Sequence, residues 1–236
     1  MQLVLFDIDG TLLHTHGAGK RAIHRALLEL FGTTGPEGHR FDGKTDRQIV
    51  RELMTIAGHG DALIDARMDD LLERYVRYLR AELDAADRPP HVYPGVPTLL
   101  DTLEARDDVV LGLLTGNLQE GARAKLESAG IAWERFAVSA FGSDAERRPE
   151  LPAVAKARAE QRLGRALDGR DVVIIGDTPA DVTCGNGIGA RGIGVATGAY
   201  KEPELRDAGA FATFANLADT HAVVDAIVGE ARVRAA

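Results

Sequence analysis

The chain has 236 residues, a formal net charge of −8 and 45% hydrophobic residues, enough for one large core or one core plus a small appended domain. An acidic surface repels nucleic acid and anionic lipid, so neither is expected as a partner, and any small anionic ligand must be drawn in by a local positive site. One cysteine excludes an intrachain disulfide, and no stretch resembles a signal peptide or a membrane helix, so the sequence predicts a cytoplasmic protein.

Short apolar runs that end in polar or glycine-containing loops recur along the chain. They lack the polar alternation of a half-exposed strand, which is typical of strands buried on both faces of a parallel sheet. The runs are residues 3–6, 109–114, 136–140, 172–175 and 192–196. Helical patterns lie between or after them at residues 97–103, 118–129, 151–163, 180–188 and 217–228. This alternation predicts an α/β fold with a Rossmann-like, doubly wound parallel sheet.

Residues 17–88 interrupt the alternation. They contain no convincing strand, and they show helical patterns at residues 19–31, 46–57 and 61–87. Gly17 and Gly19 on one side and the proline-rich stretch at residues 89–94 on the other are plausible hinges. The sequence therefore predicts an inserted α-helical cap at residues 17–88, with residues 1–16 and 89–236 forming the core.

Acidic residues follow two of the expected strands. Asp7 and Asp9 come after the first run, and Asp177 and Asp181 come after the run at residues 172–175. Ligands of an open parallel sheet bind beyond the carboxyl ends of its strands, so these carboxylates should converge there. Like charges gathered in a partly dry cleft repel each other, and a cation is needed to neutralise them. A compact set of oxygen ligands favours Mg²⁺ over zinc.

The positions of these carboxylates suggest separate roles. Asp7 ends a buried strand and is held rigidly, which suits a nucleophile that must approach phosphorus in line. Asp9, two residues on and before a glycine that allows a turn, suits proton transfer to the leaving alcohol and then from water. Asp177 and Asp181 suit metal ligation, one directly and one through water.

A phosphate group would need donors and a positive charge beside these carboxylates. Thr115 offers a hydroxyl group, and Gly116 and Asn117 offer backbone N–H groups at the start of a helix. Arg148 precedes the next helix and could bridge the phosphate and Asp7, with Arg147 as the near alternative.

The expected cap contains a loop, residues 42–47, with two interpretations of equal weight. Thr45 or Asp46 could cap the helix that follows, which would leave Lys44 and Arg47 in solvent. Alternatively, these two cations could recognise an anionic group of a substrate.

In order and position, these residues resemble the four motifs of the haloacid dehalogenase-like hydrolase superfamily. Residues 7–11 resemble motif I, Thr115 motif II, Arg148 motif III, where lysine is commoner, and residues 176–181 motif IV. The helical insertion between motifs I and II is similar to the phosphoglycolate phosphatase and β-phosphoglucomutase branch. The resemblance implies Mg²⁺, an aspartyl-phosphate intermediate and a metal shell that includes Asp7, Asp177, Asp181 and the backbone carbonyl of Asp9. The presence of Asp9 disfavours dehalogenation.

The sequence thus predicts a Mg²⁺-dependent phosphatase that acts on a small phosphomonoester, either phosphoglycolate-like or a sugar phosphate. An alternative is a phosphoryl-transfer mutase of the β-phosphoglucomutase type, in which a sugar phosphate replaces water as the acceptor. A signalling receiver domain is disfavoured, because it needs neither a leaving-group acid nor a cap. The sequence gives no prediction of oligomeric state.

Overall fold

The computed structural model describes residues 1–85 and 89–235, and a parallel sheet forms its centre. Among these residues the sheet has six strands in the order β5-β4-β1-β6-β7-β8, with every neighbouring pair parallel. The strands are β1 Gln2–Phe6, β4 Val109–Thr115, β5 Val138–Phe141, β6 Val172–Gly176, β7 Arg191–Val195 and β8 Ala212–Phe214. The predicted α/β fold is confirmed. The sequence pattern did not reveal β8, because this short edge strand is only half-buried.

Helices cover both faces of the sheet. Val4 and Phe6 of β1 pack with α4, α5 and α9, whereas Leu3 and Leu5 pack on the opposite face with α6 and α7. The helices are α4 Val96–Glu104, α5 Gln119–Ser128, α6 Leu151–Leu163, α7 Pro179–Cys184, α8 Glu202–Asp207 and α9 Thr220–Ala235. Burial on both faces explains why the strands read as continuous apolar runs.

Two helices differ from the sequence prediction. The helix expected at residues 180–188 is α-helical only to Cys184, and residues 185–188 continue as a tighter 3₁₀ turn. Gly185 and Gly187 lie in that turn, and glycine disfavours a continuing α-helix. Helix α8 was not predicted, because a six-residue helix whose buried residue is Leu205 has no apolar stripe to recognise.

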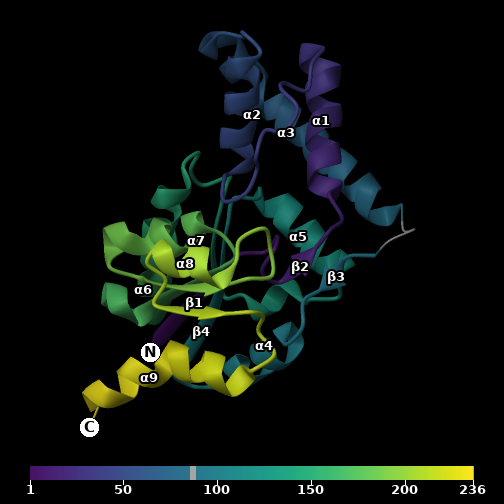
Figure 1. The fold of residues 1–236 in the computed structure, drawn as a ribbon. Coiled ribbons are helices and arrows are strands. Elements are labelled where there is room, and N and C mark those ends of the chain that lie inside the picture. The colour runs from purple at the N-terminus through teal and green to yellow at the C-terminus, as the bar shows by residue number, and fades with distance from the viewer. Residues whose placement is uncertain (86–88, 236) are drawn as a thin grey trace.

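Helices α1 Ala18–Phe31, α2 Asp46–Ile56 and α3 Asp61–Asp84 form a group in the upper part of Figure 1, and α3 also packs against α5. Their buried side chains form a hydrophobic cluster of their own, which Leu118 joins from the sheet-bearing part of the chain. The short strands β2 Leu13–His14 and β3 His91–Val92 pair antiparallel at the point where the chain leaves the sheet-bearing part for these helices and returns from them. The last two residues of the helix predicted at residues 61–87 lie outside the described residues.

The carboxyl end of β1 lies where the order in which the chain adds strands to the sheet reverses direction. From β1 the chain passes through α1, α2 and α3 and returns to β4 beside β1, then continues outward to β5. It next crosses to β6 on the other side of β1 and continues to β7 and β8. In open α/β sheets such a switch point is where ligands bind. None of the described helices has the length and apolar character needed to cross a membrane.

Candidate active site

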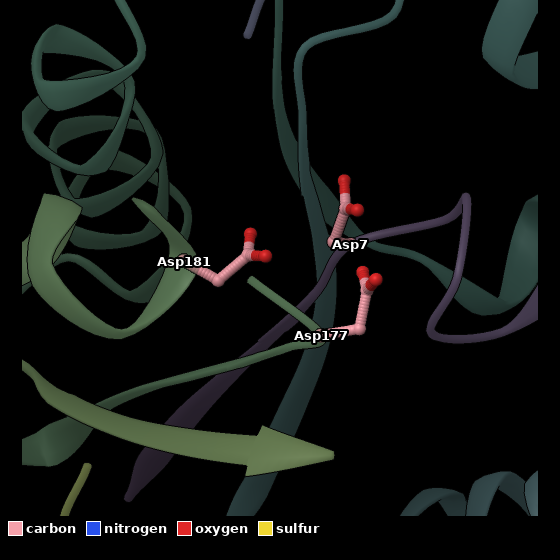
Figure 2. A group of neighbouring side chains, drawn as sticks. All are labelled: Asp7, Asp177 and Asp181. Atoms are coloured by element: carbon pink, nitrogen blue, oxygen red, sulfur yellow. The ribbon is translucent and has the colours of Figure 1, made fainter. Parts of the chain in front are cut away.

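Carboxylates from separate segments meet beyond the carboxyl ends of β1 and β6. Asp7 follows β1, Asp177 follows β6, and Asp181 lies in the first turn of α7. One oxygen of each of these three residues lies within 4.8 Å of the others, and all three side chains are buried. Figure 2 shows the carboxylates of Asp7 and Asp177 pointing in the same direction, with Asp181 pointing toward them from α7. The convergence expected from the strand-end rule is therefore seen for these three residues.

Arg148 supplies positive charge to the cluster. It begins the 3₁₀ turn Arg148–Glu150 and is 3% exposed, whereas Arg147 is exposed. Its Nη2 lies 3.2 Å from Oδ1 of Asp7, and it also forms an ion pair with Oδ1 of Asp181. The same nitrogen donates to the carbonyl of Leu114 over 3.3 Å. Of the two arginines that the sequence left open, Arg148 is thus the one beside Asp7.

The cluster has more negative charge than Arg148 can balance. The pKa of Asp7 is raised to about 6, chiefly by burial and also by the nearby carboxylates of Asp181 and Asp9, against the opposing effects of Arg148 and Thr115. Burial, together with Asp181 and Asp7, holds the pKa of Asp177 well above its ordinary value. When all three carboxylates are ionised, they leave two negative charges beyond the one that Arg148 balances, and one divalent cation would neutralise both.

Asp181 is both a helix cap and a member of the cluster. Its Oδ2 accepts hydrogen bonds from the backbone N–H of Thr178 at 2.9 Å and from the hydroxyl of Thr178 at 2.6 Å, in a reciprocal capping box. Its Oδ1 pairs with Arg148. Because both oxygens have protein partners, this side chain is better placed to hold a water of a metal shell than to bind the metal directly.

The carboxylate of Asp9 is hydrogen-bonded to the loop after β4 and to α5. Its Oδ2 accepts from Nδ2 of Asn117 at 2.7 Å and from Nζ of Lys125 at 2.6 Å. The next residue, Gly10, has φ of 84°, and a Cβ atom there would lie 2.3 Å from the carboxylate of Asp177. Only glycine therefore allows the chain to turn so closely past the cluster.

The loop after β4 lies on the other side of Asp7. Thr115 is fully buried, and its Oγ1 accepts from Nδ2 of Asn117 at 2.8 Å and from the backbone N–H of Asn117 at 3.4 Å. The backbone N–H of Leu118, at the start of α5, donates to Oδ2 of Asp46 over 2.8 Å. A carboxylate from α2 therefore occupies part of the helix start that the sequence suggested for phosphate. The backbone approaches closely here, because a Cβ at Gly116 would lie 2.0 Å from the carbonyl oxygen of Lys44.

A cavity of about 280 Å³ lies between the strand ends and helices α1, α2 and α3. Asp7, Asp9, Thr115, Gly116, Asn117, Arg148 and Asp177 line it from one side. From the other side it is lined by residues that include Lys20, Phe41, Lys44, Asp46 and Tyr75. A space of this size suits a small ligand.

The two cations predicted to recognise the substrate differ in position. Lys44 lines the cavity, although its Nζ pairs with Oε2 of Glu52 at 2.5 Å. Arg47 is not in the lining: it pairs with Asp69 at 3.0 Å and borders a different cleft. The structure thus places Lys44, but not Arg47, on the cavity. Asp46 is adjacent to Arg47, but successive residues of a helix point about 100° apart, so only Asp46 faces the site.

Comparison with known proteins identifies the family. The model of the haloacid dehalogenase-like hydrolases matches residues 1–189, a span that contains every strand-end residue described above. The chain belongs to the haloacid dehalogenase-like hydrolases. A phosphoglycolate phosphatase of Rhodospirillum rubrum is 30% identical over 217 residues, covering 91% of this chain and 87% of the relative. A protein named "Probable phosphatase IndB" in Dickeya dadantii is 28% identical, over 87% of this chain and 86% of the relative.

Solved structures of this haloacid dehalogenase-like fold align over nearly the whole chain. A hydrolase from Pseudomonas syringae has a TM-score of 0.70 at 21% identity and covers 96% of this chain and 99% of its own. A β-phosphoglucomutase from Clostridium difficile has a TM-score of 0.72 at 15% identity and covers 99% of both chains. At these identities the likeness concerns the fold.

Sequence reasoning missed two residues of this haloacid dehalogenase-like site. Lys125 is 3% exposed and contacts Asp9, and Asp46 is 6% exposed and contacts the start of α5. A signal for Lys125 was present, because it lies between Ala122 and Leu126 on the buried stripe of α5, where lysine is unusual. Asp46 had no comparable signal, since an acidic residue in the first turn of a helix is common.

Proposed function

We propose that this hydrolase is a Mg²⁺-dependent phosphatase that cleaves a small phosphomonoester through an aspartyl-phosphate on Asp7. The observation that carries the proposal is the position of Asp7: it directly follows β1, lines a small cavity and lies 3.2 Å from the guanidinium of Arg148. A carboxylate held rigidly beside a fixed cation suits in-line attack on phosphorus. Arg148 and Thr115 are proposed to bind the oxygens of the phosphoryl group, together with backbone N–H groups of Gly116 and Asn117.

The acidic cluster fits a divalent cation. Its donors are oxygens, which favours Mg²⁺, and its two unbalanced negative charges match one such ion. Asp7 and Asp177 are proposed to hold the ion directly, with the backbone carbonyl of Asp9, and Asp181 through water. When bound, the cation would neutralise charge on the phosphoryl oxygens. It would also favour ionised Asp7, the form that attacks.

Asp9 is proposed as the acid and base of the reaction. As Asp7 bonds to phosphorus, the bond from phosphorus to the leaving oxygen breaks, and Asp9 gives that oxygen a proton. In the second half, Asp9 takes a proton from the water that attacks phosphorus, the bond to Asp7 breaks, and inorganic phosphate forms. Asp9 lines the same cavity as Asp7, which supports this assignment.

We also propose that residues 17–88 form a cap domain and that residues 1–16 and 89–236 form the core. The separate hydrophobic cluster of α1, α2 and α3 supports this division, as does the antiparallel pair β2–β3 where the chain leaves and returns. Because the cap lines half of the cavity, it would exclude water from the phosphoryl group and contribute to substrate choice.

The proposed substrate is a small phosphomonoester with a second anionic group, with phosphoglycolate as the first compound to test. The relative from Rhodospirillum rubrum carries that name. Two lysines of the cap side, Lys20 and Lys44, line the cavity, and Nζ of Lys20 lies over the ring of Phe41, 5.4 Å from its centroid. These ammonium groups could approach a carboxylate of the substrate.

A panel of phosphomonoesters tests the proposal. The purified protein should release inorganic phosphate from phosphoglycolate in the presence of Mg²⁺, and the panel should include glycerol phosphate, sugar phosphates and nitrophenyl phosphate. Phosphate release from none of them would refute the proposal. A mutase would instead require a sugar bisphosphate as activator and would give an isomeric sugar phosphate, detectable by NMR.

A further inference from the structure

Lys125 is a buried lysine whose contacts lie at the proposed reaction centre. It projects from α5 and is 3% exposed, and its Nζ donates to Oδ2 of Asp9 and to Oδ1 of Asn117, both at 2.6 Å. A lysine is rarely buried without charged or polar partners, because removing the ammonium from water is costly. Lys125 has such partners in Asp9 and Asn117.

The hydrogen bonds around Asp9 fix the orientation of its carboxylate. Lys125 and Asn117 both donate to Oδ2, and within the described residues no hydrogen bond reaches Oδ1. Nδ2 of Asn117 also donates to Oγ1 of Thr115, which ties this arrangement to the loop beside Asp7. One oxygen is thus anchored by charge-assisted bonding, and the other is left for proton transfer.

The helices of the proposed cap enclose Lys125. A Cβ atom placed on Gly19 of α1 would lie 3.5 Å from Nζ of Lys125 and 3.6 Å from the hydroxyl of Tyr75. Asp46 of α2 is buried nearby, and the charge of Lys125 opposes the rise in the pKa of Asp46 that burial causes. Three segments of the cap side therefore contribute to the surroundings of this lysine.

We propose that Lys125 is a positioning residue that holds Asp9 in the orientation needed for proton transfer, in a site completed by Asp46. The inference rests on the proposed function, because it assumes that Asp9 is the acid and base. The competing interpretation is that Lys125 only balances the buried charge of Asp46 and affects catalysis through stability alone.

The two interpretations differ in which half of the reaction is slowed. With nitrophenyl phosphate, the leaving group needs little protonation, so formation of the aspartyl-phosphate depends weakly on Asp9. Hydrolysis of that intermediate still requires a base to take a proton from water. A misplaced Asp9 should therefore slow the second half more than the first, and the phosphorylated enzyme should accumulate.

The test compares Lys125→Met with the wild type and with Arg123→Met, a control on the same helix whose exposed arginine pairs with Glu127. Turnover of nitrophenyl phosphate and the fraction of phosphorylated enzyme, measured by intact mass after acid quenching, are the two readouts. Lys125→Met should lower kcat by roughly tenfold to a hundredfold and raise the phosphorylated fraction, whereas Arg123→Met should change neither. Lys125→Arg should recover part of the rate.

Unchanged turnover in folded Lys125→Met would overturn the proposal. So would a lower turnover with an unchanged phosphorylated fraction, because that pattern indicates a general structural effect. If the single variant does not fold, Lys125→Met combined with Asp46→Asn removes one charge of each sign and is compared with Asp46→Asn alone by the same two criteria. If the wild type turns over without forming phosphorylated enzyme, the proposed function is refuted as well. Failure of the Lys125 proposal alone leaves the phosphorylated wild-type enzyme detectable, so the two failures can be distinguished.

Discussion

Asp46 links the helical part of the chain to the sheet, and its titration should be visible in the stability of the protein. The pKa of Asp46 is raised from 3.8 to about 6, chiefly by burial and to a lesser extent by Asp9, against opposing effects from Lys125, the N–H of Leu118 and Tyr75. A raised pKa means that the folded state binds this proton more tightly than the unfolded state. The associated stability is therefore fully present below pH 3.8 and is lost as the pH rises through about 6.

The magnitude follows from the two pKa values. At pH 5, which is one unit below the pKa of Asp46 in the folded state and above its pKa in the unfolded state, preferential protonation of folded Asp46 adds about 1.4 kcal/mol to the free energy of unfolding. At pH 8 it adds almost nothing. Asp46→Asn keeps an oxygen that can accept from Leu118 but removes the titration. We compare the unfolding free energy of the wild type minus that of Asp46→Asn at two pH values. This difference should be larger at pH 5 than at pH 8 by about 1.4 kcal/mol.

The assay is urea unfolding of both proteins at several pH values, in a chelator so that metal binding does not contribute. Other titrating groups are present in both proteins and cancel in the difference. Asp69→Asn is the matched control in α3, because the side chain of Asp69 is 89% exposed and its ion pair with Arg47 lies at the surface. A wild-type advantage that is independent of pH would refute the inference that Asp46 is buried and protonated more readily in the folded protein.

Further expectations concern the reaction itself. Asp7→Asn should abolish turnover without changing the circular dichroism spectrum, and activity within about tenfold of the wild type, a loss of only ~1.4 kcal/mol, would exclude Asp7 as the nucleophile. Exhaustive chelation should remove activity and Ca²⁺ should inhibit, since its larger, more flexible coordination shell misaligns a carboxylate; full activity in chelator would contradict the metal assignment. Asp9→Asn should slow alkyl phosphates more than nitrophenyl phosphate, and equal losses in the phosphorylation step would remove Asp9 from the acid role. Lys20→Ala and Lys44→Ala should raise KM for substrates with a second anion by roughly tenfold to a hundredfold, whereas Arg47→Ala should not; the opposite ranking would restore Arg47 as the specificity residue.

Much of the fold could be predicted because its signals are local. Strands buried on both faces read as continuous apolar runs, and the glycine-containing loops after them mark the carboxyl ends of the strands. The general rule that these ends share one edge of the sheet then brought Asp7, Asp177 and Asp181 together. The signals failed where burial was slight, as in β8 and α8, whose short segments carry no periodic pattern.

The residue pattern was sufficient to predict the α/β sheet and the set of acidic residues at its strand ends, since both follow from local pattern and one rule of topology. The tertiary structure decided which neighbouring side chains meet. It placed Arg148 rather than Arg147 beside Asp7, and it put Asp46 rather than Arg47 into the site. It also buried Lys125 against Asp9. These contacts join positions up to 141 residues apart (Asp7 to Arg148), and their partners are set by how helices dock on the sheet, which no local pattern encodes.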